Sequence, residues 1–281
     1  MDSTQTTNEV SLFKIKDFKT QAKAQLKNKK KGPVLITLIS ALFLIAFYML
    51  FFPLMLKLSY APSTAAFFRI YAIMLPLSLI WGLLLCVVYF AMLKVLFKLN
   101  KTSEEVTLGD FFKSFSIWKK AIGSALYQFL FIFLWELAII LPVGIIGGIT
   151  AAFVVGEYEQ VSIILLIILF VAYIFAIVFI YRKVYQYSQM FYLVADKPET
   201  AKIKESLKTS IKMTKGYKRK LFLLDLSFIG WAILCVLTLG ILTLWILPYY
   251  YMTKINAYNF LRKVNNLDEE KIPLESPTNE E

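Results

Sequence analysis

Long apolar stretches separated by short segments rich in lysine and arginine make up most of the chain. A helix that crosses a bilayer needs about 20 consecutive, mostly apolar residues. Four stretches meet this requirement in succession, at about 34–56, 70–93, 121–141 and 161–181. Each of them therefore predicts a transmembrane helix.

A fifth apolar block runs from 221 to about 261, which is too long for one span and long enough for two. Leu239-Gly240 divides the block, and glycine readily adopts the backbone angles that a tight reversal requires. We therefore expect a fifth span at about 221–238 and a sixth at about 241–261. The whole pattern predicts an all-α protein, a polytopic membrane helix bundle of about six transmembrane helices.

The positions of the basic residues predict the orientation, because lysine and arginine concentrate on the cytoplasmic side of membrane proteins. With the N-terminus in the cytoplasm, only Lys57 and Arg69 fall in segments assigned to the outside. All the other lysines and arginines then lie in the N-terminal arm, the cytoplasmic loops or the C-terminal end. A five-span threading would move Lys254, Arg262 and Lys263 outside. We therefore expect an even number of spans and both termini in the cytoplasm.

Three segments outside the expected spans combine lysines with apolar residues at helical spacing: the arm at 1–33, about 107–120 and about 198–215. Basic amphipathic helices of this kind lie at the surface of an anionic leaflet. Alternatively, their apolar faces pack beneath the helix bundle, and both alternatives remain open. The basic residues expected at the level of the lipid headgroups are Lys29, Lys30, Lys31, Lys119, Lys120, Arg182, Lys183, Lys218, Arg219 and Lys220.

Each of these amphipathic segments has an apolar stripe, which consists of Ile203, Leu207 and Ile211 in the 198–215 segment and is weakest in the arm. In the arm, the stripe is Ile15, Phe18, Ala22 and Leu26. The 107–120 segment begins with Thr107 and Asp110 at capping-box spacing, with aspartate in place of the usual glutamate or glutamine. Its expected apolar face consists of Leu108, Phe111, Phe112, Phe115 and Trp118.

The composition narrows the class of protein. Hydrophobic residues make up 58% of the chain, charged residues 18%, and the mean hydropathy is +0.64. Soluble domains are about 45–50% apolar and about 25% charged, so a soluble class is excluded. The net charge of +12, placed as above, indicates anionic headgroups of the inner leaflet as partners rather than nucleic acid. The polar, acidic end at 264–281 predicts a short disordered cytoplasmic tail.

Several kinds of catalytic chemistry are absent from the sequence. There is no histidine, which excludes Ser-His-Asp triads and histidine-ligated metals. Cys86 and Cys235 lie within apolar runs and read as small apolar residues of membrane helices. No phosphate-binding glycine loop and no Gly-x-Ser-x-Gly motif is present. We expect a non-enzymatic protein with no catalytic residue, no metal and no cofactor.

Two acidic residues lie within expected spans, where ionisable side chains often mark functional sites. Glu136 is expected well inside the third span, where it faces a polar cavity, binds a cation or proton, or hydrogen-bonds across the bundle. Alternatively, it lies near the outer interface of the membrane. Asp225 lies about one turn inside the fifth span, within reach of a salt bridge to the basic cluster 218–220.

Small residues at every fourth position follow the third span: Gly144, Gly148, Ala152 and Gly156. Such a face allows two helix backbones to approach closely, and the alternative is that it lines a permeation path. Pro142 is expected to interrupt the third span just before this face. The segment 142–156 is then a re-entrant helix, an interfacial helix or an extension of the third span.

The run from Leu221 to Trp231 (LFLLDLSFIGW), followed by Thr238-Leu239-Gly240, Leu244-Trp245 and Leu247-Pro248-Tyr249, resembles a bacterial membrane family known as domain of unknown function 975. Met213-Thr214-Lys215-Gly216-Tyr217 is similar to the segment that precedes this run in the family. The resemblance implies a multi-pass protein of the bacterial cytoplasmic membrane with no established activity. The chain departs from the pattern in an insertion across about 144–180 and in Glu136, where a neutral residue is expected.

These features favour a non-enzymatic interaction or accessory protein of the bacterial envelope, with stress or antimicrobial-peptide protection as one role in that class. Its expected partners are membrane lipids and a second membrane protein or a second copy of the chain. The alternative is a transporter or channel for small molecules, ions or lipids. That alternative uses Glu136 and the small-residue face.

Overall fold

A computed structural model describes residues 12–60, 62–155 and 158–267. Within these ranges every regular element is a helix, so the predicted all-α class is confirmed. Gly156, the start of the N-terminal arm and most of the predicted disordered tail lie outside the described residues. Five helical segments are long and apolar enough to cross a membrane: Lys31–Ser59, Thr64–Thr102, Leu108–Val155, Gln160–Asp196 and Lys218–Leu237.

The chain forms two compact units. The first comprises the described residues of 1–50, 91–114 and 212–281, and the second comprises those of 51–90 and 115–211. Two long helices contribute to both units, α3 (Lys31–Ser59) and α4 (Thr64–Thr102).

The first unit contains a helix pair formed by α2 (Ile15–Leu26) and α12 (Thr243–Val264). Phe18, Ala22 and Leu26 of the predicted stripe are buried, and Ile15 is half-buried. The apolar face of α2 therefore packs within the protein, in agreement with the second alternative, in which this face packs against other helices. The core of this unit also includes Leu96, Leu99, Phe111, Leu221, Leu224, Met252 and Tyr258.

The predicted capping box at Thr107 and Asp110 is formed. The Thr107 N–H donates to Asp110 Oδ2 at 3.0 Å, and the Asp110 N–H donates to Thr107 Oγ1 at 3.3 Å. The helix that follows, α5 (Leu108–Ser114), is short. A 3₁₀ turn, η1 (Phe115–Ile117), separates it from the next α-helix.

The 3₁₀ turn corrects the predicted apolar face of 107–120. Phe111 is buried, but Phe112 and Trp118 are exposed. The tighter winding of a 3₁₀ turn rotates the residues after it relative to an α-helix, so Trp118 no longer shares the face of Phe111. Phe112 precedes the turn and is turned about 100° around α5 from the buried Phe111. The buried face is instead Phe111, Ser114 and Ile117.

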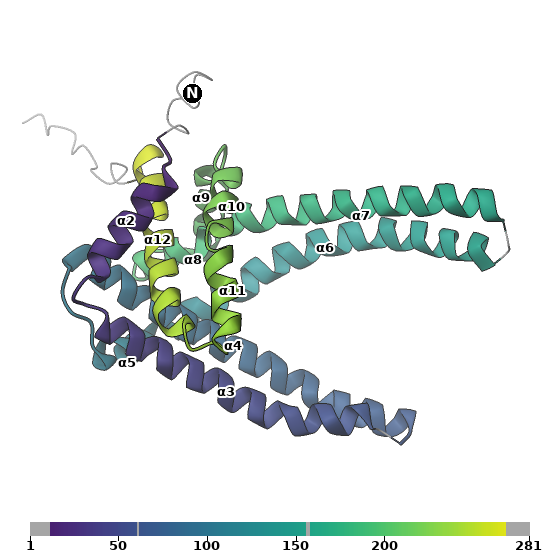
Figure 1. Ribbon diagram of the computed structural model, residues 1–281, viewed down its shortest axis with the longest axis horizontal. Helices are drawn as coiled ribbons and strands as arrows, with labels where there is room; N and C mark the ends of the chain where they lie inside the picture. The colour runs from purple at the N-terminus through teal and green to yellow at the C-terminus, as the bar shows by residue number, and fades with distance from the viewer. Residues whose placement is uncertain (1–11, 61, 156–157, 268–281) are drawn as a thin grey trace, which may run out of the picture. The chain divides into compact units, whose positions relative to one another are not determined.

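The last apolar block of the first unit is divided into three helices, α10 (Lys218–Leu226), α11 (Ile229–Leu237) and α12. The tight turn predicted at Leu239-Gly240 is confirmed, because both residues have positive φ, 51° and 86° respectively. The Gly240 N–H donates to the Cys235 carbonyl at 2.8 Å, which closes the end of α11. Figure 1 shows α11 and α12 as the two arms of a hairpin.

The second unit contains a long antiparallel hairpin of α6 (Trp118–Val155) and α7 (Glu159–Tyr187), which run side by side in Figure 1. Contrary to our expectation, Pro142 does not interrupt the third apolar segment. Of the three alternatives for 142–155, the structure shows the helical extension. An apolar surrounding offers the backbone no other hydrogen-bond partners, so the helix continues despite the N–H that proline lacks.

Two shorter helices close the base of this hairpin, α8 (Met190–Asp196) and α9 (Ile203–Met213). The Gln189 N–H donates to Ser210 Oγ at 3.1 Å, and that hydroxyl donates to the Gln186 carbonyl at 2.9 Å. These bonds fix α9 against the end of α7. The helix predicted at 198–215 is thus shorter than expected and begins at Ile203.

Candidate functional site

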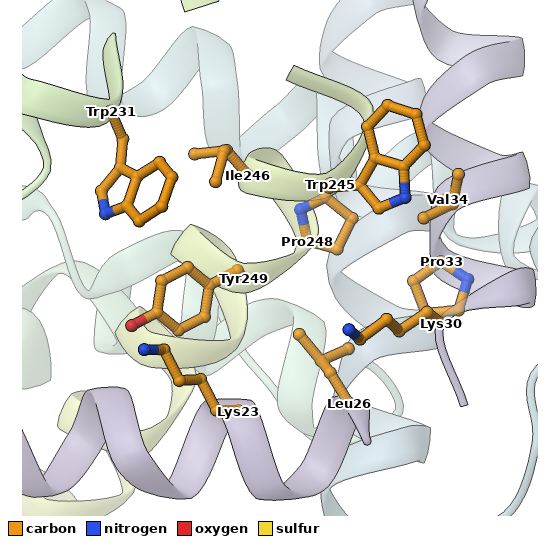
Figure 2. A pocket seen from close by; sticks show the side chains of 10 residues that line it. All are labelled: Lys23, Leu26, Lys30, Pro33, Val34, Trp231, Trp245, Ile246, Pro248 and Tyr249. Carbon is orange, nitrogen blue, oxygen red and sulfur yellow. The ribbon is translucent and has the colours of Figure 1, made fainter. Parts of the chain in front are cut away.

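A cavity of about 330 Å³ lies in the first unit between α2, the start of α3, α11 and the first turns of α12 (Figure 2). We call it the Lys–Trp cavity. It is lined by Lys23, Leu26, Lys30, Pro33, Val34, Trp231, Trp245, Ile246, Pro248 and Tyr249.

The cavity combines two cations with three large aromatic side chains. Lys23 and Lys30 are exposed, and neither side chain has a hydrogen bond or ion pair in the part of the chain that the structure describes. In Figure 2 the Lys30 ammonium points toward the middle of the cavity, and the Lys23 ammonium lies beside Tyr249. Lysine, tryptophan and tyrosine together are typical of the membrane–water interface. The arrangement suits an anionic group attached to an apolar body.

Two neighbouring lysines have a structural role instead. Lys19 Nζ donates to the Ser227 carbonyl at 2.8 Å and lies 4.2 Å from the centre of the Phe228 ring. Burial lowers the pKa of Lys19, and the charge of Lys23 lowers it further. Lys29 donates to the Ser103 carbonyl, so it anchors the loop before α5, and its place at the lipid headgroups stays a prediction. Lys23 and Lys30, which line the cavity, have no salt bridge to a described acidic residue.

Asp225 is in a salt bridge with Lys254, a partner outside the predicted cluster 218–220. Lys254 Nζ of α12 lies 2.8 Å and 3.0 Å from the two carboxylate oxygens of Asp225 on α10. The Tyr250 hydroxyl donates to the same carboxylate at 3.0 Å. The Lys254 side chain is 8% exposed and that of Asp225 25%, so this pair joins α10 to α12 in a largely buried position.

Glu136 lies near the basic end of α7 and not at the middle of the hairpin. Trp135 Nε1 donates to the Tyr187 hydroxyl at 2.9 Å, and Lys183 Nζ lies 3.5 Å from the centre of a Trp135 ring. Glu136 is therefore nearly level with Arg182 and Lys183. The carboxylate is half-buried and makes no hydrogen bond or ion pair with any described residue.

The described residues of the small-residue face of α6 do not pack against another described helix, so the helix-packing role of this face stays a prediction. Gly144, Gly148 and Ala152 are exposed, and a Cβ at either glycine would meet nothing within 4 Å. Gly147 faces α7 instead, since a Cβ there would lie 3.9 Å from Leu169. Glycines four residues apart share a face, but their spacing does not say which face the neighbouring helix covers.

The other predicted headgroup lysines and arginines divide into two groups. Lys120 donates to the carbonyls of Pro198, Glu199 and Ala201, so it holds the loop before α9. Lys183 is in the cation–π contact above. By contrast, Lys31, Lys119, Arg182 and Arg219 are exposed, and Lys218 and Lys220 are half-buried.

Sequence reasoning did not place the Lys–Trp cavity. Trp231 and Trp245 contributed only to the family resemblance, and Lys23 was one lysine among many. A signal was present, because two tryptophans flank the Leu239-Gly240 turn in a stretch without charged residues. Only the packing of α2 against α12 brings the lysines of the arm to those tryptophans. Among the described residues, no cluster of three cysteine, aspartate or glutamate side chains is arranged to hold a metal ion.

The comparison with known families covers nearly every element just described. Residues 13–265 match the family described as "Protein of unknown function (DUF975)". The chain belongs to this family. The matched range starts just before α2 and includes the whole of α12, so the Lys–Trp cavity of this DUF975 protein lies entirely within it. No curated protein and no solved structure matches the chain.

Proposed function

We propose that this DUF975 protein is a non-enzymatic membrane protein whose Lys–Trp cavity binds the headgroup of an anionic phospholipid. The observation that carries the proposal is the pair of unbonded lysines beside Trp231, Trp245 and Tyr249 in one cavity. A phosphate accepts hydrogen bonds from both ammonium groups, and the aromatic side chains contact the glycerol and upper acyl chains.

The family resemblance and the basic arm favour the inner leaflet of a bacterial cytoplasmic membrane as its location. In that leaflet, the protein acts as an accessory to a second membrane protein or to a second copy of itself. The exposed small-residue face of α6 supplies a surface on which another helix can approach closely. We include protection against cationic antimicrobial peptides in this class, because such peptides and the cavity compete for the same anionic headgroups.

The headgroup proposal predicts a specific loss of lipid affinity. Near a membrane surface each lysine contributes about 1 kcal/mol, so replacing both Lys23 and Lys30 by glutamine is expected to weaken binding roughly 30-fold. The measurement is titration of the purified protein with short-chain phosphatidylglycerol, read from its thermal midpoint. Phosphatidylcholine of the same chain length measures the contribution of the acyl chains, and inorganic phosphate that of the free anion.

A matched variant separates site binding from general electrostatics. Lys16 and Lys27 are exposed lysines of the same arm and lie outside the cavity. Their double replacement by glutamine removes the same charge and is expected to change affinity less than threefold. An equal loss in both double variants would show that only the net charge attracts the lipid and would overturn the proposed site.

The competing function, a transporter that uses Glu136, makes the opposite prediction for Glu136→Gln. Since Glu136 has no partner among the described residues, we expect this variant to keep the wild-type thermal midpoint and lipid affinity. A proton- or cation-coupled transporter would lose flux on this substitution. The measurement is proton flux across the membrane of reconstituted liposomes under a proton gradient. If the wild-type protein shows a flux that Glu136→Gln abolishes, the competing function replaces the proposed one.

A further inference from the structure

The α11–α12 hairpin is too short to cross a bilayer. Its first arm, α11, has nine residues, which span about 13 Å at 1.5 Å per residue. The hydrocarbon core of a bilayer is about 30 Å thick. A crossing would therefore need α10 to continue the first arm and most of α12 to form the second.

Both extensions pack within the first unit and carry charge. One face of α10, with Leu221 and Leu224, is buried, and α12 is buried from Pro248 onward on its inner face. The Asp225–Lys254 pair joins the two helices at the base of the hairpin. The segment 229–247, by contrast, contains no buried residue.

The arm helix α2 marks the level of that base. Lys19 donates to the Ser227 carbonyl just before α11 begins, and Lys23 lines the same cavity as Trp231. On the other arm, Trp245 and Ile246 line the cavity together with Val34 in the first turn of α3. The turn of the hairpin at Leu239-Gly240 thus lies only five residues before Trp245. From Val34, α3 continues within the same unit to Leu50, about 24 Å further.

The surface of the hairpin is suited to hydrocarbon. Residues 226–253 contain no charged side chain, and Val236 and Leu239 are 76% and 93% exposed. The polar group at the turn is satisfied internally, since the Thr238 hydroxyl bonds to the carbonyls of Leu234 and Cys235 and accepts the Leu242 N–H. Backbone at membrane depth requires such internal satisfaction.

We propose that the α11–α12 hairpin inserts into one leaflet and returns to the same side, with its apolar tip among the acyl chains of the leaflet that faces the lysines of α2. Lys23 and Lys30 set the headgroup level, and the tip lies roughly 10 Å below it, as in monotopic helices. The crossing helices of the described chain are then α3, α4, α6 and α7. This number is even, so both termini still lie on one side.

The test is the depth of two positions in nanodiscs. In a cysteine-free background (Cys86→Ala, Cys235→Ala), Val236→Cys and Leu239→Cys are labelled with an environment-sensitive fluorophore. We expect the strongest quenching by lipids that carry a nitroxide on the upper acyl chain. Neither cysteine is expected to react with a water-soluble maleimide added to either side of proteoliposomes.

Two reference positions calibrate the two sides of the membrane. Ser63→Cys, between α3 and α4, and Glu105→Cys, before α5, are expected to react from opposite sides. Reaction of Leu239→Cys from the Ser63 side would show that the hairpin crosses, and reaction from the Glu105 side would show that it does not insert. Either result would overturn the proposal.

Uncharged lipids separate this proposal from the headgroup site. Insertion of the tip depends on apolar surface, so the same depth is expected in membranes of phosphatidylcholine alone. The loss of affinity for phosphatidylglycerol in the Lys23→Gln, Lys30→Gln double variant is measured independently of the depth of the hairpin. The hairpin depth and the headgroup site can therefore fail separately.

Discussion

Replacing Lys254 by methionine is expected to lower the free energy of unfolding of the first unit by roughly 3 kcal/mol, because it leaves the Asp225 carboxylate without its cation in the interior. Asp225 would keep the hydrogen bond from Tyr250, which is why the expected loss is at the lower end for a broken buried pair. The measurement is chemical denaturation of the purified protein in mild detergent. Tryptophan fluorescence reports on this unit through Trp231 and Trp245.

A double-mutant cycle distinguishes the pair from the packing around it. Asp225→Leu alone is also expected to be destabilising, since Lys254 is then a buried charge without a counter-ion. The double variant, Asp225→Leu with Lys254→Met, is expected to recover most of the loss, because two apolar side chains replace two charges. Additive losses would mean that the two side chains do not interact in solution.

The Asp225–Lys254 pair shows that the sequence predicts local structure better than it predicts partners that are distant along the chain. The sequence predicted that Asp225 forms a salt bridge, since a carboxylate beside an apolar helix needs a counter-ion. It pointed to the nearest cations along the chain, at 218–220. The actual partner lies 29 positions away, and only the packing of α10 against α12 brings it close.

Local features were predictable where neighbouring residues determine them. The capping box at Thr107 and Asp110 and the turn at Leu239-Gly240 depend on spacing and on backbone freedom within a few residues, and both are confirmed. The membrane class follows from the length and the hydropathy of the apolar stretches, and both can be read directly from the sequence.

The level of Glu136 and the orientation of the small-residue face were not predictable in the same way. Both depend on how α6 is aligned with α7, and the two helices are apolar on almost every side. A helix without a polar face offers no periodic signal for which side meets its neighbour. The alignment instead comes from specific contacts such as that of Trp135 with Tyr187.

Replacing Gly32 by alanine is expected to cost about 3 kcal/mol of stability, because a Cβ at this position would overlap the backbone carbonyl oxygen of Val106. The same Cβ would lie 3.0 Å from the carbonyl carbon and from Cγ2 of Val106. Backbone cannot rotate away as the end of a side chain can. The start of α3 or the segment before α5 must therefore move, and denaturation in detergent measures the cost.

Gly82→Ala is the matched control, since Gly82 also lies in a long helix, α4, and a Cβ there meets nothing within 4 Å. That variant is expected to be neutral or up to about 1 kcal/mol more stable. A wild-type stability of the Gly32→Ala variant would contradict the close approach of Gly32 to Val106.

The close approach of Gly32 to Val106 also has a functional consequence, because it fixes the start of α3, where Lys30 and Val34 line the Lys–Trp cavity. Gly32→Ala is therefore expected to weaken phosphatidylglycerol binding even under conditions in which the protein remains folded, whereas Gly82→Ala leaves that binding unchanged.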